Sequence, residues 1–277
     1  MSIIEGIIYG VIQGITEFLP ISSSGHLALI QNFFGAVDME SNYLTFTVLL
    51  HLGTLAVVIA VFRYDVWEMI KGFFTLIAKI CRGRLSDGLT YGERVFILVF
   101  IATLPLIIAV PFSDSVEVFS SASWLVGLML LINGGLLYVS DKLTNEKLTI
   151  KRAYPKHALI IGFVQLIGIM PGISRSGSTI VGSLFLGFRK QDAVKLSFLM
   201  SIPAIAGANL LKLTDLASNP LPDNSIPAVI AGVAAAVISG LFAIRLLEYI
   251  AKNKKMSVFS LYCVIIGTSA IISDIII

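Results

Sequence analysis

The chain has 277 residues, of which 56% are hydrophobic and only 13% are charged, and its mean hydropathy is +0.91. Ordinary soluble domains carry about 25% charged residues, so this composition excludes that class and predicts a polytopic membrane protein. The net charge of +3 is small and the basic residues lie in short loops between apolar runs, which argues against a nucleic-acid partner.

The first apolar stretch, about residues 2–35, is broken in its middle by LPISSSGH, and a later stretch, about 157–188, is broken by MPGISRSGS. Backbone that leaves a helix at membrane depth must be buried in protein or line a wet cavity. We therefore expect each stretch to form a re-entrant helix-loop-helix hairpin. The first 62 residues contain no Lys or Arg, which argues against a cleaved signal peptide.

Six other segments are apolar enough to span about 30 Å of hydrocarbon, which takes about 20 residues. In chain order they are about 43–62, 95–111, 124–140, 195–212, 226–247 and 257–276. Residues 66–80 carry Lys71 and Lys79 among large apolar side chains, and we expect a short amphipathic helix along the cytoplasmic interface there. The predicted fold class is an all-α polytopic membrane protein with six transmembrane helices and two re-entrant hairpins, in a single domain over 1–277.

The distribution of basic residues predicts the orientation of these segments. Of the 20 Lys and Arg residues, six lie in 63–94, five in 142–156, three in 189–195 and four in 245–255, so these regions are expected to be cytoplasmic. The loops 112–123 and 213–225 contain no Lys or Arg and are expected to face outward; their acidic residues are Asp114, Glu117, Asp215 and Asp223. This topology makes the first hairpin enter from outside and the second from the cytoplasm.

An internal repeat relates the two hairpins. QGITEFLPISSSGH (13–26) aligns without gaps with QLIGIMPGISRSGS (165–178) at an offset of 152. Three spans separate the hairpins, so the second copy is inverted, with halves of about 1–140 and 153–277. In inverted repeats of this kind, broken helices meet near the membrane midplane and the binding site lies between them. The identical pairs are Gln13/Gln165, Ile15/Ile167, Ile21/Ile173, Ser22/Ser174, Ser24/Ser176 and Gly25/Gly177.

Both breaks are rich in Ser and Gly and are followed by a new apolar run. A helix that starts there has Ser near its N-cap and offers free backbone amides and the positive end of its dipole to an anion. Because no Gly-rich nucleotide motif is present, the expected anion is a phosphate on something other than a soluble nucleotide. The candidate substrate-binding residues are Gln13, Ser22, Ser24, Gly25, Ser174, Ser176, Gly177 and Thr179.

Arg175 is the only Arg or Lys within either break. A charge at this depth indicates function, and the guanidinium fork suits phosphate oxygens. The repeat makes Arg175 the counterpart of Ser23, so the two residues are expected to lie near each other. The alternative is that Arg175 only ties the two loops together through backbone carbonyls.

Glu17 and His26 flank the first break. Together with Ser23 they are the parts of a phosphoryl-transfer centre: Ser23 as nucleophile, His26 exchanging the proton, and Glu17 orienting the histidine or binding a divalent cation. The alternative is that Glu17 and His26 only form hydrogen bonds in a polar core. Gln13 and Gln165 are candidates for bridging the hairpins.

The polar residues His51 and Asn133 lie within predicted spans. We expect them to be interhelical hydrogen-bonding residues outside the catalytic set.

QGITEFLPISSSGH and PGISRSGSTIVG, together with LLHLGTLAVVI, resemble the undecaprenyl-diphosphate phosphatase family, the bacitracin resistance proteins, over nearly the whole chain. The resemblance implies a multi-pass hydrolase of the bacterial plasma membrane. Its reaction would convert undecaprenyl diphosphate to undecaprenyl phosphate and inorganic phosphate, with a divalent cation such as Mg²⁺ or Ca²⁺. It would recycle the lipid carrier for peptidoglycan and other cell-envelope polymers, and bacitracin would compete by binding the substrate.

By position, the resemblance assigns catalytic roles to Glu17, Ser23, His26 and Arg175, with Glu17 as the metal ligand. Family members often have a further glutamate four residues earlier, and here that residue is Gln13, so the acid role is expected to rest on Glu17. The predicted topology puts the entrance to the site at the outer face. A transporter or flippase of a phosphorylated polyprenyl lipid is the alternative function. Three points stay open: whether Ser23 or water is the attacking group, whether the protein is a homodimer or has another oligomeric state, and which tail length it prefers.

Overall fold

The structure is a computed structural model that describes residues 1–34, 44–112, 119–143, 147–216, 225–253 and 255–276. Within these ranges it is all-helical, and the one β contact is an isolated bridge between Leu148 and Phe188. The α-helices are α1 (Ile3–Phe18), α2 (Ser23–Phe34), α4 (Leu44–Val61), α5 (Arg63–Cys81), α6 (Tyr91–Thr103), α8 (Ser123–Ser140), α9 (Pro155–Ile167), α10 (Arg175–Phe185), α11 (Lys190–Leu216), α12 (Ile226–Asn253) and α13 (Ser257–Ile276).

Six helical segments among the described residues are long and apolar enough to cross a membrane. They agree with the six predicted segments to within about five residues at each end, so the prediction of an all-helical, multi-pass membrane protein is confirmed. The segments are Leu44–Val61, Tyr91–Phe112, Ser123–Ser140, Lys190–Lys212, Ile226–Lys252 and Ser257–Ile276. The second continues from α6 into a 3₁₀ helix, η2 (Leu104–Phe112), because Pro105 lacks the amide that α-helical bonding needs.

Several helix starts are determined by local sequence. At the start of α1, the Ser2 hydroxyl accepts a bond from the Glu5 amide (3.2 Å) and the Glu5 carboxylate accepts one from the Ser2 amide (2.8 Å). Thr90 and Glu93 form the same reciprocal box at the start of α6. Such boxes satisfy backbone donors that have no partner inside the helix. The two boxes therefore determine where α1 and α6 begin.

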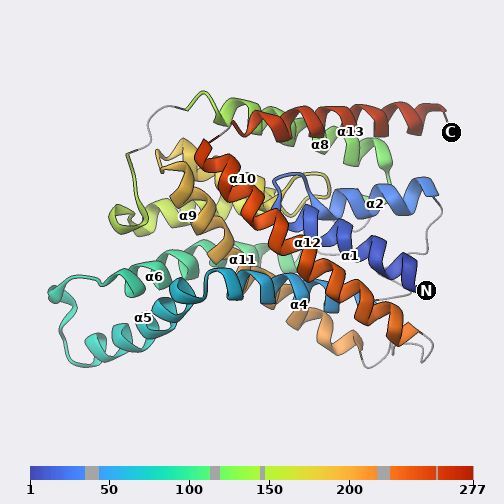
Figure 1. Ribbon diagram of the computed structural model, residues 1–277. Coiled ribbons are helices and arrows are strands. Elements are labelled where there is room, and N and C mark those ends of the chain that lie inside the picture. The colour runs from blue at the N-terminus through green and yellow to red at the C-terminus, as the bar shows by residue number, and fades with distance from the viewer. Residues whose placement is uncertain (35–43, 113–118, 144–146, 217–224, 254, 277) are drawn as a thin grey trace.

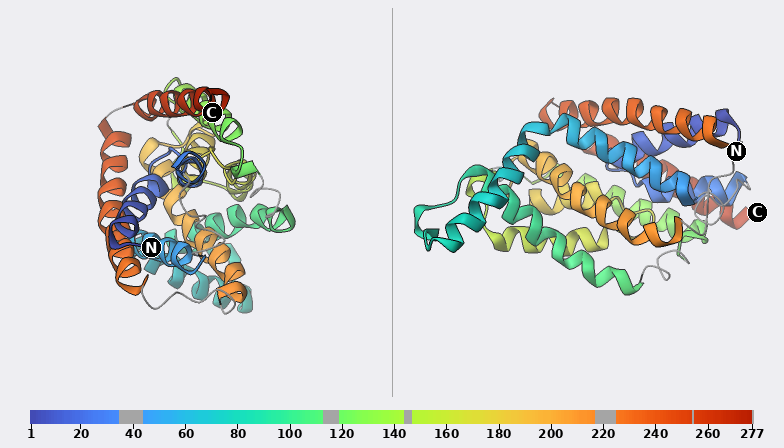
Figure 2. Two further views of the ribbon diagram at one scale, coloured as in Figure 1. Left: turned by 90° about the vertical axis from the view of Figure 1, so that its right-hand side faces the viewer. Right: turned by 90° about the horizontal axis from the view of Figure 1, so that it is seen from below.

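The links rich in basic residues lie at one end of the molecule. In Figure 1 the α5–α6, α8–α9, α10–α11 and α12–α13 links are on the left, while both chain termini are on the right, and Figure 2 shows the same separation. Asp141, just after α8, ties this link end together by accepting bonds from Lys190 and from the amides of Met256 and Ser257. The acidic residues Asp114, Glu117 and Asp223 of the predicted outward loops lie outside the described residues.

The two interrupted helix pairs approach from opposite ends. Helix α1 begins and α2 ends on the side of the termini, whereas α9 begins and α10 ends on the link side (Figure 1). The residues between the paired helices, 19–22 and 168–174, therefore meet inside the bundle. This arrangement brings the two predicted breaks together.

Small residues allow α1 to pack closely against α12. A Cβ atom added to Gly10 would overlap the carbonyl oxygen of Gly232, and one added to Gly6 would overlap that of Ala228. Helices in membranes associate through such small residues because these let the backbones approach. The contact fixes the direction of α1 and with it the position of Glu17, near the C-terminal end of this helix.

Helix α5 covers the predicted amphipathic segment, 66–80, and packs against α6. Gly72 and Gly92 make this contact close, since a Cβ on either would overlap backbone of the other helix. Trp67 and Phe74 on α5 are exposed. A position along the membrane interface stays a prediction for this helix.

Candidate active site

The first break follows from Pro20 and Ser22. Proline disfavours helical backbone at the preceding residue, and α1 ends at Phe18 with Leu19 extended (φ −70°, ψ 147°). Ser22 then adopts a left-handed conformation with φ of 74°, which is unusual for a residue other than glycine. Strained backbone of this kind persists only where the surrounding structure holds it in place.

The second break has the same plan. Ser174 is the N-cap of α10, and its hydroxyl accepts a bond from the Gly177 amide (3.1 Å). Gly172 supplies the left-handed residue, with φ of 95°. The Asn133 side chain on α8 joins this break to the first one, because it donates to the Pro20 carbonyl (2.8 Å) and accepts from the Ser174 amide (3.3 Å).

The two breaks are in direct contact. The Ser22 hydroxyl accepts bonds from the Gly25 amide of its own helix (3.2 Å) and from the Gly172 amide of the other break (3.1 Å). Gly25 lies so close to Gly172 that a side chain there would meet its backbone. From the second break, the Ser176 hydroxyl donates to the Leu19 carbonyl (3.3 Å). The N-termini of α2 and α10 are therefore held side by side.

Glu17 is the centre of the polar cluster. Its Oε1 accepts from Arg175 Nη2 (2.6 Å), and its Oε2 accepts from the Ser23 hydroxyl (2.8 Å) and from Gln13 Nε2 (3.1 Å). The side chains of Glu17 and Arg175 are only 7% and 16% exposed. Ser23 and Arg175, which the repeat pairs, thus meet on one carboxylate. Arg175 bonds to this carboxylate, and no bond from its guanidinium to a backbone carbonyl is found within the described part of the chain.

His26 is not bonded to Glu17. Its Nδ1 lies 2.7 Å from the Ser22 carbonyl, and its Nε2 lies 2.8 Å from the hydroxyl of Tyr262 on α13. Since a carbonyl can only accept, Nδ1 carries the proton in the neutral imidazole and Nε2 accepts from the tyrosine. The two rings are also stacked, with centroids 5.6 Å apart. The hypothesis that Glu17 orients the histidine does not match this arrangement, in which Ser22 and Tyr262 orient it.

The other candidates divide into two groups. Ser22 and Gly25 from the first break and Ser174 and Gly177 from the second line the junction of the two breaks. Ser24 is exposed, and its hydroxyl lies 3.4 Å from that of Ser22. Thr179 is directed away from the junction: its hydroxyl bonds to the Arg175 and Ser176 carbonyls and to the Ser197 hydroxyl (2.6 Å).

The hydrogen bonds of Gln13 and Gln165 do not match the predicted bridging of the hairpins. Gln13 donates to Glu17 on its own helix, whereas Gln165 Nε2 donates to the Ala102 carbonyl on α6 (3.2 Å). Gln13 thus bonds within α1, and Gln165 bonds to a helix outside both hairpins. His51 bonds through Nδ1 to the Thr47 carbonyl of its own helix (2.9 Å).

The described residues do not fit a resident metal ion. Within those ranges no three His, Cys, Asp or Glu side chains gather at one point. Glu17 is the single carboxylate of the cluster, and both of its oxygens already accept bonds, one of them from a cation. Oε1 of Gln13 is buried and unbonded in the described structure, but one neutral oxygen beside an arginine-paired carboxylate is not a cation cage.

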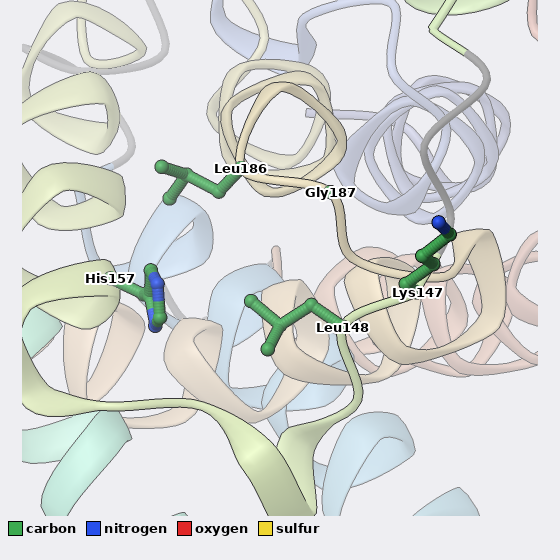
Figure 3. Close-up of a pocket in the computed structure, with 5 residues that line it drawn as sticks. All are labelled: Lys147, Leu148, His157, Leu186 and Gly187. Atoms are coloured by element: carbon green, nitrogen blue, oxygen red, sulfur yellow. The ribbon is translucent and has the colours of Figure 1, made fainter.

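A hollow at the link end of the molecule is separate from this cluster. It is lined by Lys147, Leu148, His157, Leu186 and Gly187, and in Figure 3 His157 and Lys147 lie on its opposite sides. None of the residues singled out from the sequence lines it. The hollow lies near the basic links and not near Arg175. The candidate active site is therefore the junction of the two breaks.

Comparison with known proteins finds similarity over nearly the whole chain. The model of the family described as "Bacitracin resistance protein BacA" matches residues 6–269. The chain is 41% identical over 273 residues to an undecaprenyl-diphosphatase of Alkaliphilus metalliredigens and 42% identical over 273 residues to one of Halothermothrix orenii, with 98% of each chain covered in both cases. An undecaprenyl-diphosphatase of Methanobrevibacter smithii is 38% identical over 272 residues, with 96% of each chain covered.

Proposed function

The chain belongs to the bacitracin resistance protein BacA family, and from this membership we propose that it hydrolyses undecaprenyl diphosphate to undecaprenyl phosphate and inorganic phosphate. The names of these relatives supply the substrate. One observation of the structure carries the proposal for this chain: a buried carboxylate, Glu17, joins a hydroxyl from one helix N-terminus to a guanidinium from another. Such a set can bind and transfer a phosphoryl group in a multi-pass membrane protein.

Substrate binding would begin by exchange at Arg175. A diphosphate that reaches the junction competes with the Glu17 carboxylate for the guanidinium, whose planar fork suits phosphate oxygens. First-turn amides of α2 and α10 add backbone donors, as helix N-termini commonly do for phosphate. The exchange leaves Glu17 bonded to Ser23 and free to act as a base.

The chemical step then uses the bond between Ser23 and Glu17. The Ser23 oxygen attacks the terminal phosphorus, its proton passes to Glu17 Oε2, and the bridging P–O bond breaks to release undecaprenyl phosphate. Water then hydrolyses the phosphoserine: its oxygen bonds to phosphorus, the Ser23 O–P bond breaks, and the proton on Glu17 returns to the serine oxygen. Both water protons leave with the phosphate. Arg175 and the helix N-termini stabilise the charge that develops on the transferred group.

His26 and Tyr262 form a second proton-handling pair beside this centre. The Nε2 atom of His26 can exchange a proton with the substrate only through the Tyr262 hydroxyl, or after that hydroxyl moves away. Tyr262 is thus proposed as a positioning residue for His26. It lies 236 positions away in the sequence, and no motif marks it.

A divalent cation, Mg²⁺ or Ca²⁺, enters this proposal with the substrate. Diphosphate oxygens bind such ions, and Mg²⁺ in particular is commonly held by substrate phosphates with few protein ligands. Because the described residues form no cation cage, no step above is assigned to the ion. Competition by bacitracin for the substrate and a homodimeric assembly stay predictions from the family resemblance.

The two re-entrant hairpins and the inverted repeat are proposed for the same chain. Their support is that α1–α2 and α9–α10 enter from opposite ends, and that Gly10 and Gly162, at the same offset of 152, both sit against backbone of a neighbouring helix. The basic links at one end support a cytoplasmic location for that end. The site would then be reached from the outer face of the plasma membrane, where the spent carrier is released.

Phosphate release by the purified protein tests the proposal. In detergent with Mg²⁺ or Ca²⁺ and a long-chain prenyl diphosphate, wild-type protein should release inorganic phosphate, whereas Arg175→Ala and Ser23→Ala should lose at least 100-fold of the rate. Arg245→Ala, at an exposed position of α12, is the matched control and should keep the wild-type rate. A wild type that releases no phosphate would refute the proposal.

Trapping of a phosphorylated protein distinguishes the two candidate nucleophiles. Turnover in H₂¹⁸O should be accompanied by a trapped phosphoserine at Ser23 if the hydroxyl attacks. Direct attack by water would leave Ser23 unmodified during turnover, with Glu17 then acting on the water.

A transporter of a phosphorylated polyprenyl lipid is the second candidate, and the opposed approach of α1–α2 and α9–α10 favours it. Proteoliposomes separate the two functions. Leaflet exchange of polyprenyl phosphate without release of inorganic phosphate would support the transporter, and release without exchange would support the enzyme.

A further inference from the structure

An apolar groove runs beside α10 and carries no assigned role. Its volume is about 260 Å³, and it lies between α9 and α10, with one residue of α8 at its edge. Ile160, Ile167 and Phe185 are exposed at its rim, so the groove is open toward the lipid side of the bundle. Its lining is Leu136, Ile160, Val164, Ile167, Ser178, Val181, Gly182, Phe185 and Leu186.

The groove continues the helix face that starts at the active site. Residues three and four apart on a helix share one face, so Arg175, Ser178, Gly182 and Phe185 follow one another along α10. On α9, Ile160, Val164 and Ile167 form the opposing face in the same way. From Arg175 to Phe185 the stripe is about 15 Å long, about half of the hydrocarbon thickness of a bilayer.

Ser178 is the single polar side chain of the groove, and its hydroxyl is unsatisfied. Ser178 is 2% exposed, and its Oγ has no hydrogen-bond partner among the described residues. Buried hydroxyls are normally bonded, so an unbonded one points to a missing partner. It lies one turn beyond Arg175, and Gly168 packs against both residues, since a Cβ there would be 2.8 Å from Arg175 Cα and 3.1 Å from Ser178 Oγ.

The order of chemical groups along the stripe is that of a prenyl diphosphate. A cationic side chain comes first, then one hydroxyl, and then only apolar side chains. A prenyl diphosphate presents an anionic diphosphate, an ester oxygen and a branched hydrocarbon in the same order. Charge complementarity at one end and continuity with the active site therefore select this ligand over an ordinary bilayer lipid.

We propose that the α9–α10 groove binds the first part of the polyprenyl tail, with Ser178 donating a hydrogen bond to the ester oxygen or adjoining phosphate oxygen at the junction of head and tail. The assignment rests on the phosphatase function proposed above and names its tail subsite. The groove stops at Leu186, which also lines the polar hollow of Figure 3. Only the tail segment nearest the diphosphate is bound by protein, and the remainder lies in lipid.

A groove-filling variant tests the tail subsite. Val164→Phe places a ring in the groove, while Val258→Phe places one at an exposed position of α13 and is the matched control. Kinetics are compared for two substrates, a long-chain prenyl diphosphate and the five-carbon isopentenyl diphosphate. Val164→Phe should raise KM for the long-chain substrate about ten-fold, as expected from losing contact with about two CH₂ groups. It should leave the kinetics of the five-carbon substrate within about two-fold, and Val258→Phe should change neither.

The outcomes separate this inference from the proposed function. If wild-type protein releases no phosphate from either substrate, the proposed function fails. If wild type is active and Val164→Phe slows both substrates equally, or neither, the tail subsite is wrong.

Photo-crosslinking covers the case in which Val164→Phe does not fold. Wild-type protein is irradiated with a prenyl diphosphate that carries a diazirine near the start of its tail. Labelled peptides should come from 155–186, and labelling concentrated on α12 or α13 would overturn the proposal. A diacyl phospholipid probe that labels 155–186 equally well would also overturn it, because the groove would then be a general lipid contact.

Discussion

The bond between Glu17 and Arg175 can be tested by a double-variant cycle on the free energy of unfolding. The two side chains are 2.6 Å apart and largely buried, so removing one leaves a charge without its partner. Breaking a buried ion pair in this way costs about 3–5 kcal/mol. In Arg175→Met the Glu17 carboxylate keeps its bonds from Ser23 and Gln13, so the lower value, about 3 kcal/mol, is expected.

Glu17→Gln should cost less, about 2 kcal/mol, because the new amide oxygen can still accept a bond from Arg175. Independent effects would add to about 5 kcal/mol. The double variant contains neither charge and should cost no more than about 3 kcal/mol, which gives a coupling of about 2 kcal/mol. Phosphate release should be lost in all three variants, because the double variant regains stability and not chemistry.

The assay is unfolding in mixed micelles followed by circular dichroism, alongside phosphate release. The exposed pair of Lys71 and Glu68, with side chains 51% and 48% exposed, is the internal control and should couple by less than about 1 kcal/mol. Additive effects of Glu17→Gln and Arg175→Met would refute the buried bond. Recovery of phosphate release in the double variant would refute a catalytic role and leave the pair as a structural tie.

Three further variants test individual contacts. Tyr262→Phe keeps the stacked ring but removes the bond to His26. We expect kcat to fall about five-fold, the pH profile of kcat to shift and KM to stay unchanged. An unshifted pH profile would contradict the positioning role of Tyr262. Gln13→Glu places a second carboxylate beside Glu17. Because two carboxylates bind a divalent cation better than one, the cation concentration for half-maximal activity should fall about ten-fold. An unchanged cation titration would mean that the two side chains do not share an ion. For Asp141, burial raises the pKa, but bonds from the Ser257 and Met256 amides and the charge of Lys190 outweigh it and leave the pKa below its usual value. Asp141→Asn should therefore cost about 2 kcal/mol at neutral pH, and its stability difference from wild type should persist above about pH 4 and shrink as the pH falls further; a difference independent of pH would mean that this carboxyl is not held ionised.

The spans and the breaks could be predicted because each depends on local sequence. Uninterrupted apolar runs give the spans, and Pro20 and Gly172 interrupt them where helical backbone cannot continue. The repeat also predicts that Ser23 and Arg175 lie close together. This prediction uses only the alignment of 13–26 with 165–178, in which Ser23 and Arg175 are equivalent positions.

The partners of individual polar groups could not be predicted in the same way. Whether Glu17 bonds to His26 or to Ser23 depends on how the chain turns at Ser22, whose left-handed conformation no sequence pattern requires. The contact with Tyr262 depends on how α13 packs against α8, and neither helix contains a motif residue. The sequence predicted that Asn133 forms interhelical hydrogen bonds, but not its two partners. These are backbone groups of the breaks, and backbone groups carry no sequence signal because every residue has them.

The contact between Gly10 and Gly232 has a consequence for genetics. Two glycine backbones touch there, so neither position offers a side chain that could be made smaller to accommodate an enlarged partner. A loss-of-function allele such as Gly10→Ala should consequently have no compensating second-site allele on the facing helix. Gly53 differs, because a methyl group there meets the side chain of Val233, and Val233→Ala can act as a suppressor. A suppressor screen would thus distinguish backbone contacts from side-chain contacts without any measurement of structure.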